Sequence, residues 1–232
     1  MGKVSNIEWC DATWNPWMGC SKVSPACAHC YAEREMTLYN RDFDTVTRAK
    51  DGTFYAPLKW KEARKIFTCS WSDFFHPAAD AWRHDAWKVI AGAPHHIYQI
   101  LTKRPERILQ LYPYGNWGMV PRIWWGVSVE NARFYWRIEE LQKISVAVRF
   151  LSIEPLLGPM PDLPLEGIDG VIVGGESGAG FRPLNLEWVR QIRDRCVDRS
   201  VAFFFKQKSA FRPKMLDRLL DGREWNELPV LR

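Results

Sequence analysis

Three cysteines that lie close together offer the clearest chemistry in this chain of 232 residues. Cys20, Cys27 and Cys30 follow the spacing C-x6-C-x2-C, and Tyr31 comes directly after the last of them. Three thiolates on one loop can bind three irons of a [4Fe–4S] cluster, because such clusters are held by cysteine sulfur. The fourth iron then has no protein ligand and can bind another molecule. The loop over residues 19–31 therefore predicts a reactive metal centre.

Other chemistry is also open to these thiols. Cys10 can complete a four-cysteine zinc site with the three loop cysteines. Structural zinc sites usually combine two closely spaced cysteine pairs, called hooks here (C-x2-C or C-x4-C), and this chain has one, Cys27 and Cys30. A disulfide framework is less favoured, because a chain of this length buries a core without covalent crosslinks. The thiols can also be incidental, with His29 as a solvated residue inside the hook.

Short apolar runs alternate with helical patterns along the rest of the chain. We expect strands near 9–14, 65–69, 97–101, 123–127, 148–153, 171–174 and 201–205, and helices over 31–41, 80–92, 104–112, 131–143 and 185–199. Residues 42–60 are polar and are expected to be irregular, with a turn at Asp51-Gly52. Strand–helix–strand units pair in parallel, and near-continuous apolar strands indicate a sheet covered on both faces. The sequence thus predicts one α/β domain over residues 1–232, a parallel barrel or partial barrel.

Polar residues follow most of these strands at the point where each apolar run ends. The polar ends are Ser70 to Asp73, Thr102 to Arg104, Ser128 to Asn131, Glu154, Glu176 and Lys206. Helix capping explains some of them, with Ser70, Asp73 and Asn131 as candidates. Charged residues directly after buried strands are instead typical of an active site, which lies at the carboxyl ends of the strands in such barrels. The cysteine loop follows the first strand, so both features are expected at one rim.

The composition is that of a globular protein able to bind a polyanion. The net charge is +5, and no apolar run approaches the length of about 18 residues that a membrane helix needs. Several of the thirteen tryptophans have basic neighbours, in Lys59-Trp60-Lys61, Trp82-Arg83, Trp87-Lys88 and Trp136-Arg137. Such rings either stack on nucleic-acid bases or belong to the core. The start of the chain has no apolar signal segment, so we expect a cytoplasmic protein with reduced thiols and no membrane partner.

The cysteine loop and the strand pattern together resemble the radical S-adenosylmethionine (SAM) superfamily, whose members open a partial (β/α)6 TIM-type barrel with a three-cysteine loop. A closer likeness covers nearly the whole chain. It is to a family of short phage and bacterial proteins of unknown function that share the same cysteine loop. The shared strings lie at 99–105, 126–131, 150–159, 173–178 and 204–207. The usual superfamily spacing is C-x3-C-x2-C, and here the first gap is six residues.

The resemblance implies a [4Fe–4S] cluster on Cys20, Cys27 and Cys30, with SAM on the open iron. One electron would then cleave SAM to a 5′-deoxyadenosyl radical, and an electron donor such as flavodoxin or ferredoxin would be a partner. The resemblance also implies which residues bind SAM. Lys103 would contact the methionyl carboxylate, Ser70 and Asp73 the amino group or sulfonium, and Ser128, Glu130 and Asn131 the ribose or the methionyl end. Tyr31 would lie beside the cluster and adenine, and Glu154 and Glu176 would lie toward substrate or adenine.

A shorter likeness is to spore photoproduct lyases, radical SAM enzymes that repair a thymine dimer in DNA. Their second strand ends in a cysteine and a hydroxyl residue, as in Cys69-Ser70, and their third ends in Thr-Lys, as in Thr102-Lys103. This likeness implies that Cys69 donates a hydrogen atom, with a small buried thiol as the structural alternative.

The leading prediction is a radical SAM enzyme that acts on nucleic acid, through repair of a DNA lesion or modification of a base. One alternative is a zinc-stabilised nucleic-acid-binding protein without catalysis. Another is a cluster-containing barrel that no longer cleaves SAM and acts with a partner protein.

Overall fold

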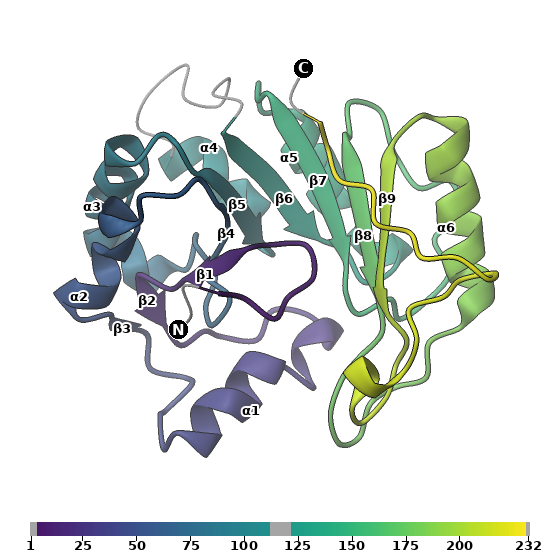
Figure 1. Cartoon of the computed structure of the whole chain (residues 1–232), viewed down its shortest axis with the longest axis horizontal. Helices are drawn as coiled ribbons and strands as arrows, with labels where there is room; N and C mark the ends of the chain where they lie inside the picture. Colours follow the sequence, from purple (N-terminus) through teal and green to yellow (C-terminus); the bar gives the residue numbers. More distant parts are fainter. Residues whose placement is uncertain (1–3, 112–121, 231–232) are drawn as a thin grey trace.

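Seven parallel strands form the main sheet in the computed structural model, which describes residues 4–111 and 122–230. The strands are β1 (Ala12–Trp14), β4 (Lys65–Thr68), β5 (Ile97–Thr102), β6 (Ile123–Ser128), β7 (Val148–Ile153), β8 (Gly170–Gly174) and β9 (Ala202–Gln207). They pair in that order across the sheet, which curls into a half-barrel (Figure 1). The prediction of an α/β protein built on a partly closed parallel sheet is confirmed at this level.

The helices described are α1 (Tyr31–Leu38), α2 (Asp51–Phe54), α3 (Asp80–Gly92), α4 (Ile108–Leu111), α5 (Trp136–Gln142) and α6 (Leu186–Asp198). The helix expected over 104–112 is α4 preceded by a 3₁₀ turn at Pro105–Arg107, and residue 112 lies outside the described residues. No helix in the described parts of the chain is both long enough and apolar enough to cross a membrane.

The segment expected to be irregular, residues 42–60, contains regular structure. Here β3 (Thr47–Arg48) pairs antiparallel with β2 (Trp17–Met18), and α2 begins at the expected turn, at Asp51. The prediction was wrong because a strand of two residues has no readable alternation of polar and apolar side chains. The buried ring of Phe54 anchors this segment to the main core.

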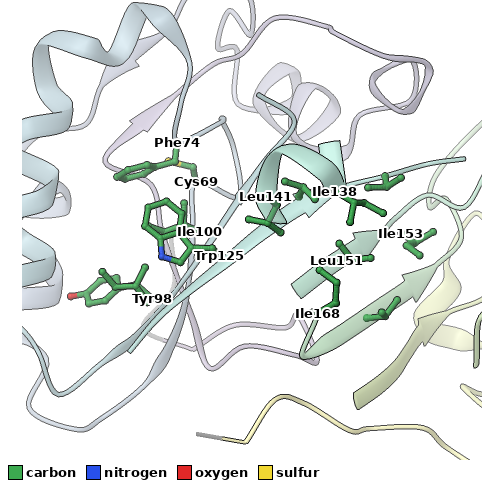
Figure 2. Packing of buried hydrophobic residues seen from close by; sticks show 14 of the residues in the cluster. Cys69, Phe74, Tyr98, Ile100, Trp125, Ile138, Leu141, Leu151, Ile153 and Ile168 are labelled. Atoms are coloured by element: carbon green, nitrogen blue, oxygen red, sulfur yellow. The ribbon is translucent and has the colours of Figure 1, made fainter. Parts of the chain in front are cut away.

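Alternate side chains of the strands point to the convex face and form the main core with the helices. Figure 2 shows part of this packing, with Ile100 and Trp125 from neighbouring strands and Leu151 from the next one. Ile138 of α5 belongs to the same cluster, as does the fully buried Cys196 of α6. Cys196 is therefore a core residue.

The other side chains line the concave face, and their character changes along the strands. Near the amino ends they form an apolar cluster of Trp9, Cys10, Phe67, Trp124, Val148, Phe150, Ile172 and Phe204. Ser128 and Ser152 lie further along, as register partners on β6 and β7. Glu154 and Lys206 continue the same alternation, two residues beyond Ser152 and Phe204. Apart from the buried Gln99, whose Nε2 donates to the Trp9 carbonyl, the polar side chains of the concave face named here lie at the carboxyl ends of the strands.

Candidate functional site

A pocket of about 190 Å³ lies where the cysteine loop meets the carboxyl ends of the strands. All of the predicted site residues except Glu130 and Asn131 line it. They are Cys20, Cys27, Cys30, Tyr31, Cys69, Ser70, Asp73, Lys103, Ser128, Glu154 and Glu176. Arg104 and Lys206, two polar strand ends for which no ligand contact was predicted, line it as well. The fold therefore gathers residues from the whole length of the chain into one site.

The three loop cysteines are free thiols, each partly exposed. Among residues 4–111 and 122–230, no three His, Cys, Asp or Glu side chains lie close enough together to hold one metal ion. A [4Fe–4S] cluster binds each cysteine through a different iron, so its ligands are spaced more widely than those of a single ion. Cys10 packs in the apolar cluster of the concave face and does not line the pocket. The four-cysteine set of the zinc alternative is therefore not assembled.

Contacts on two sides hold the cysteine loop in place. On one side, Arg104 Nη2 donates to the carbonyl and hydroxyl of Ser21, at 3.1 and 2.8 Å. On the other side, Arg182 Nη2 donates to the carbonyl of Pro25 at 3.0 Å. The loop and α1 thus span the open side of the half-barrel, between its first and last strands (Figure 1).

Asp73 is saturated with hydrogen bonds from the protein. Its Oδ1 accepts from the Phe75 N–H (2.8 Å) and the Thr102 hydroxyl (2.7 Å). Its Oδ2 accepts from the Lys103 N–H (2.9 Å) and lies 3.2 Å from Arg104 Nη1. These contacts leave the carboxylate little capacity for the SAM amino group that the resemblance implied. Asp73 instead fixes the end of β5 and the direction of Arg104.

Tyr31 and Ser70 fasten the start of α1 to the end of β4. The Tyr31 hydroxyl donates to the Ser70 carbonyl at 2.7 Å, and the Ser70 hydroxyl accepts from Asn15 Nδ2 at 3.0 Å. Burial raises the pKa of Tyr31 well above its ordinary value, so the phenol stays neutral and remains a donor. Both residues line the pocket, and both have a structural task within its wall.

Two of the lysines that line the pocket, Lys103 and Lys206, differ in whether they have a protein partner. Lys206 Nζ lies 3.0 Å from Glu154 Oε1, and the Ser152 hydroxyl donates to Glu154 Oε2 at 3.3 Å. Within the described residues, the ammonium group of Lys103 has no hydrogen-bond or ion-pair partner. A partnerless cation in a half-enclosed pocket attracts an anionic group of a ligand.

Glu176, at the end of β8, is engaged by the loop that follows it. Its Oε2 accepts from the backbone N–H of Arg182 at 2.7 Å and from the Nε at 3.0 Å. Burial alone would raise the pKa of Glu176, but the hydrogen bonds and charge of Arg182 outweigh it and lower the pKa. The ionised carboxylate also lies 4.0 Å from His29 Nδ1. Glu176 thus helps to clamp the cysteine loop.

Cys69 follows β4 in a left-handed backbone conformation, with φ of 63°. This conformation costs a residue with a Cβ about 1–3 kcal/mol. The residue is 3% exposed, belongs to the main core cluster and lines the pocket. Burial, aided by the charge of Asp73, raises its pKa well above the ordinary value. At neutral pH Cys69 therefore keeps its S–H bond.

A family model described as "Protein of unknown function (DUF5131)" matches residues 4–229, nearly the whole chain. The chain belongs to the DUF5131 family. Comparisons with curated proteins and with solved structures gave no match.

Glu130 and Asn131 lie outside the pocket of the DUF5131 protein. Glu130 Oε2 lies 3.0 Å from Arg137 Nη1, and both side chains are 1% exposed. The Asn131 side chain accepts from the Arg133 N–H at 3.0 Å and caps the next 3₁₀ turn. Neither residue is placed for the contact with the ribose or the methionyl end of SAM that the resemblance implied.

Most of the tryptophans with basic neighbours are core residues in the DUF5131 protein. Trp87 is 1% exposed, and Trp60 and Trp82 pack against the main core. Trp136 is 40% exposed, but its basic neighbour Arg137 is buried. Of the two alternatives for these rings, Trp60, Trp82 and Trp87 therefore follow the core alternative, because they fill space between the helices and the sheet.

No ligand contact was predicted for Arg104 or Lys206 of the DUF5131 protein, although both follow strands, and no role at all was predicted for Arg182. The alternation of side chains along a strand predicts that Lys206 faces the concave side, because it lies two residues after the inward-facing Phe204. Arg104 and Arg182 act on the cysteine loop from positions far away in the chain. Such contacts have no signal in a single sequence.

Proposed function

We propose that this protein is a radical SAM enzyme with a [4Fe–4S] cluster on Cys20, Cys27 and Cys30. The observation that supports this function is a single pocket lined by the three loop cysteines and the polar ends of the strands. In this proposal the half-barrel is a (β/α)6-type barrel with the cluster loop after its first strand. When bound, the cluster supplies an electron and SAM supplies the radical chemistry.

The donor set of the loop fits such a cluster. Three partly exposed thiols share a pocket, and the remaining cysteines lie in buried positions, so an iron-bound cube keeps one open corner. Burial and the charge of Asp73 raise the pKa of Cys20 to about 11, so the residue by itself is a thiol. A bound iron ion favours the thiolate strongly enough to displace that proton.

The charged residues of the pocket fit SAM, which carries a carboxylate, an ammonium and a sulfonium group. Lys103 would bind the carboxylate, since its ammonium has no protein partner among the described residues. Glu154 offers a carboxylate, already paired with Lys206, to the ammonium group or to a ribose hydroxyl. The hydroxyl of Ser128 lines the same wall. These residues orient the ligand in a pocket of which the cysteine loop forms one side.

Cys69 is the residue we propose as a hydrogen-atom donor to a substrate radical: its S–H bond breaks, a C–H bond forms, and one electron from the electron donor with a proton returns the sulfur radical to the thiol. Its position in the pocket wall and its retained S–H bond support this role. We propose nucleic acid as the substrate class, in the repair of a lesion or the modification of a base. The net charge of +5 supports this substrate class, as do the exposed rings of Phe181 and Phe211 and the guanidinium of Arg212 beside the latter.

Anaerobic purification from a cytoplasmic expression host tests the cluster and SAM cleavage together. We expect a brown protein with about four irons and four sulfides per chain, which forms 5′-deoxyadenosine from SAM after reduction. A colourless protein with one zinc would instead support the nucleic-acid-binding alternative. A cluster-containing protein that leaves SAM intact would point to the barrel that acts with a partner protein.

A further inference from the structure

Arg104 is a buried cation next to the first cysteine of the loop. Its Nη1 lies 3.8 Å from Cys20 Sγ, within hydrogen-bond range of a sulfur acceptor. The same nitrogen lies 3.2 Å from Asp73 Oδ2. The side chain of Arg104 is 7% exposed. A guanidinium group is charged at every accessible pH, so this site carries a fixed positive charge.

The geometry of Arg104 is fixed at both ends of the side chain. Its backbone N–H donates to the Thr102 hydroxyl at 2.9 Å, and its Nη2 donates to two oxygens of Ser21. The carboxylate of Asp73 is itself held by the end of β5. Thus Cys20 faces an oriented pair of opposite charges, with the positive member donating to its sulfur.

We propose that Arg104 and Asp73 are positioning residues that set the reduction potential of the cluster through Cys20. This inference rests on the proposed function. Hydrogen bonds to the ligand sulfurs and nearby charges tune the potentials of iron–sulfur clusters. Reduction adds one negative charge to the cluster, so Arg104 favours the reduced state and Asp73 opposes it. The pair therefore adjusts how easily the cluster accepts an electron.

The two charges predict shifts of opposite sign. Replacement of Arg104 by Met (Arg104→Met) removes the cation and one hydrogen bond to sulfur, so the midpoint potential should become more negative. Asp73→Asn keeps an acceptor for the Thr102 hydroxyl but removes the anion, so the potential should become more positive. A purely structural role for these residues would disturb the loop in both variants and would not separate the signs.

The experiment is an anaerobic redox titration of the reconstituted protein without SAM, followed by electron paramagnetic resonance of the reduced cluster. Ser21→Ala is the matched control, because it removes one anchor of Arg104 and leaves the guanidinium beside Cys20. We expect wild-type potential in this control. Iron content is measured in parallel for every variant.

The outcomes separate the inference from the proposed function. If the wild-type protein binds no iron, the proposed function fails. If the wild-type protein and Arg104→Met bind equal iron at equal potential, the inference alone is overturned. If Arg104→Met fails to bind iron, the midpoint potential of Asp73→Asn is compared with that of the wild-type protein instead. A more positive potential then supports the inference, and an unchanged or more negative one contradicts it.

Discussion

Glu154 Oε1 lies 3.0 Å from Lys206 Nζ, and this ion pair crosses the end of β8 over Gly174. A Cβ at Gly174 would lie 2.8 Å from that carboxylate oxygen and 3.5 Å from the Cβ of Lys206. The missing side chain is what allows charges from β7 and β9 to meet across the strand between them. The central polar contact of the pocket thus depends on one glycine.

Gly174→Ala should displace Glu154 while the protein stays folded. The clashing atom is the end of a flexible side chain, so we expect the free energy of unfolding to change by less than about 1 kcal/mol. The affinity for SAM should fall several-fold, because the carboxylate leaves its place in the pocket. Isothermal calorimetry on reconstituted protein measures this affinity, and chemical denaturation measures the stability.

The matched control for that change is Gly126→Ala. A Cβ there would lie 2.3 Å from the ring of Phe150, a buried core residue. This variant should lose about 1–3 kcal/mol of stability from overpacking. Equal losses of stability in the two variants would contradict our account of Gly174.

The loop cysteines should differ sharply from Cys10 in iron binding. Cys27→Ala removes a proposed cluster ligand, so iron and sulfide content should fall to a small fraction of the wild-type value. Cys10→Ala changes a thiol in the apolar cluster of the concave face, so its iron content should stay near wild type. Metal analysis after anaerobic reconstitution checks both. Equal loss of metal in the two variants would restore the four-cysteine zinc alternative.

Lys103→Met should weaken the binding of SAM. Its ammonium has no partner among the described residues, so its removal takes one charge contact from the ligand and breaks no ion pair in the protein. We expect about a tenfold increase in Kd, equivalent to about 1.4 kcal/mol. Lys59→Met, which changes an exposed lysine outside the pocket, is the control. Equal affinities of the two variants would rule out the proposed contact.

The buried pair of Glu130 and Arg137 should contribute to stability. Arg137→Met would leave the carboxylate of Glu130 buried without its cation, at a cost of about 3–5 kcal/mol. Arg199→Met breaks an exposed pair with Glu166 and should change the stability little. Urea denaturation measures both variants. A small effect of Arg137→Met would indicate that this region tolerates an uncompensated charge.

His76 should make the stability depend on pH. Its Nδ1 accepts from the Ala78 N–H at 3.2 Å, so protonation of that nitrogen would break the cap of a 3₁₀ turn. Burial first, and then the charge of Arg104, lower its pKa below the ordinary value, while Asp73 opposes them. The unfolded chain therefore binds a proton at higher pH than the folded protein. Stability from this group is complete above about pH 6.5 and decreases as the pH falls toward the lowered pKa.

His76→Asn keeps a cap acceptor and removes the titrating group. Between about pH 7.5 and about pH 5.5, the wild-type protein should lose more stability than this variant. Urea denaturation at the two pH values gives the comparison. Parallel losses in both proteins would show that other groups control the acid response.

The sequence by itself determined the parallel strands, the three-cysteine loop and the face on which most site residues lie. These features are local, since they follow from apolar runs, alternation along a strand and the chemistry of clustered thiols. The strand ends also predicted the rim, because parallel strands bring their carboxyl ends to one edge.

Only the tertiary structure decided which polar residues face the pocket and which serve the fold. It turned Glu130 toward Arg137, saturated Asp73 with protein donors, and placed Arg104 beside a cysteine 84 positions away in the chain. The physical reason is that buried polar groups must find partners, and the partners at hand depend on how the crossovers pack. That packing brings together residues that are far apart along the chain, and a single sequence does not predict such contacts.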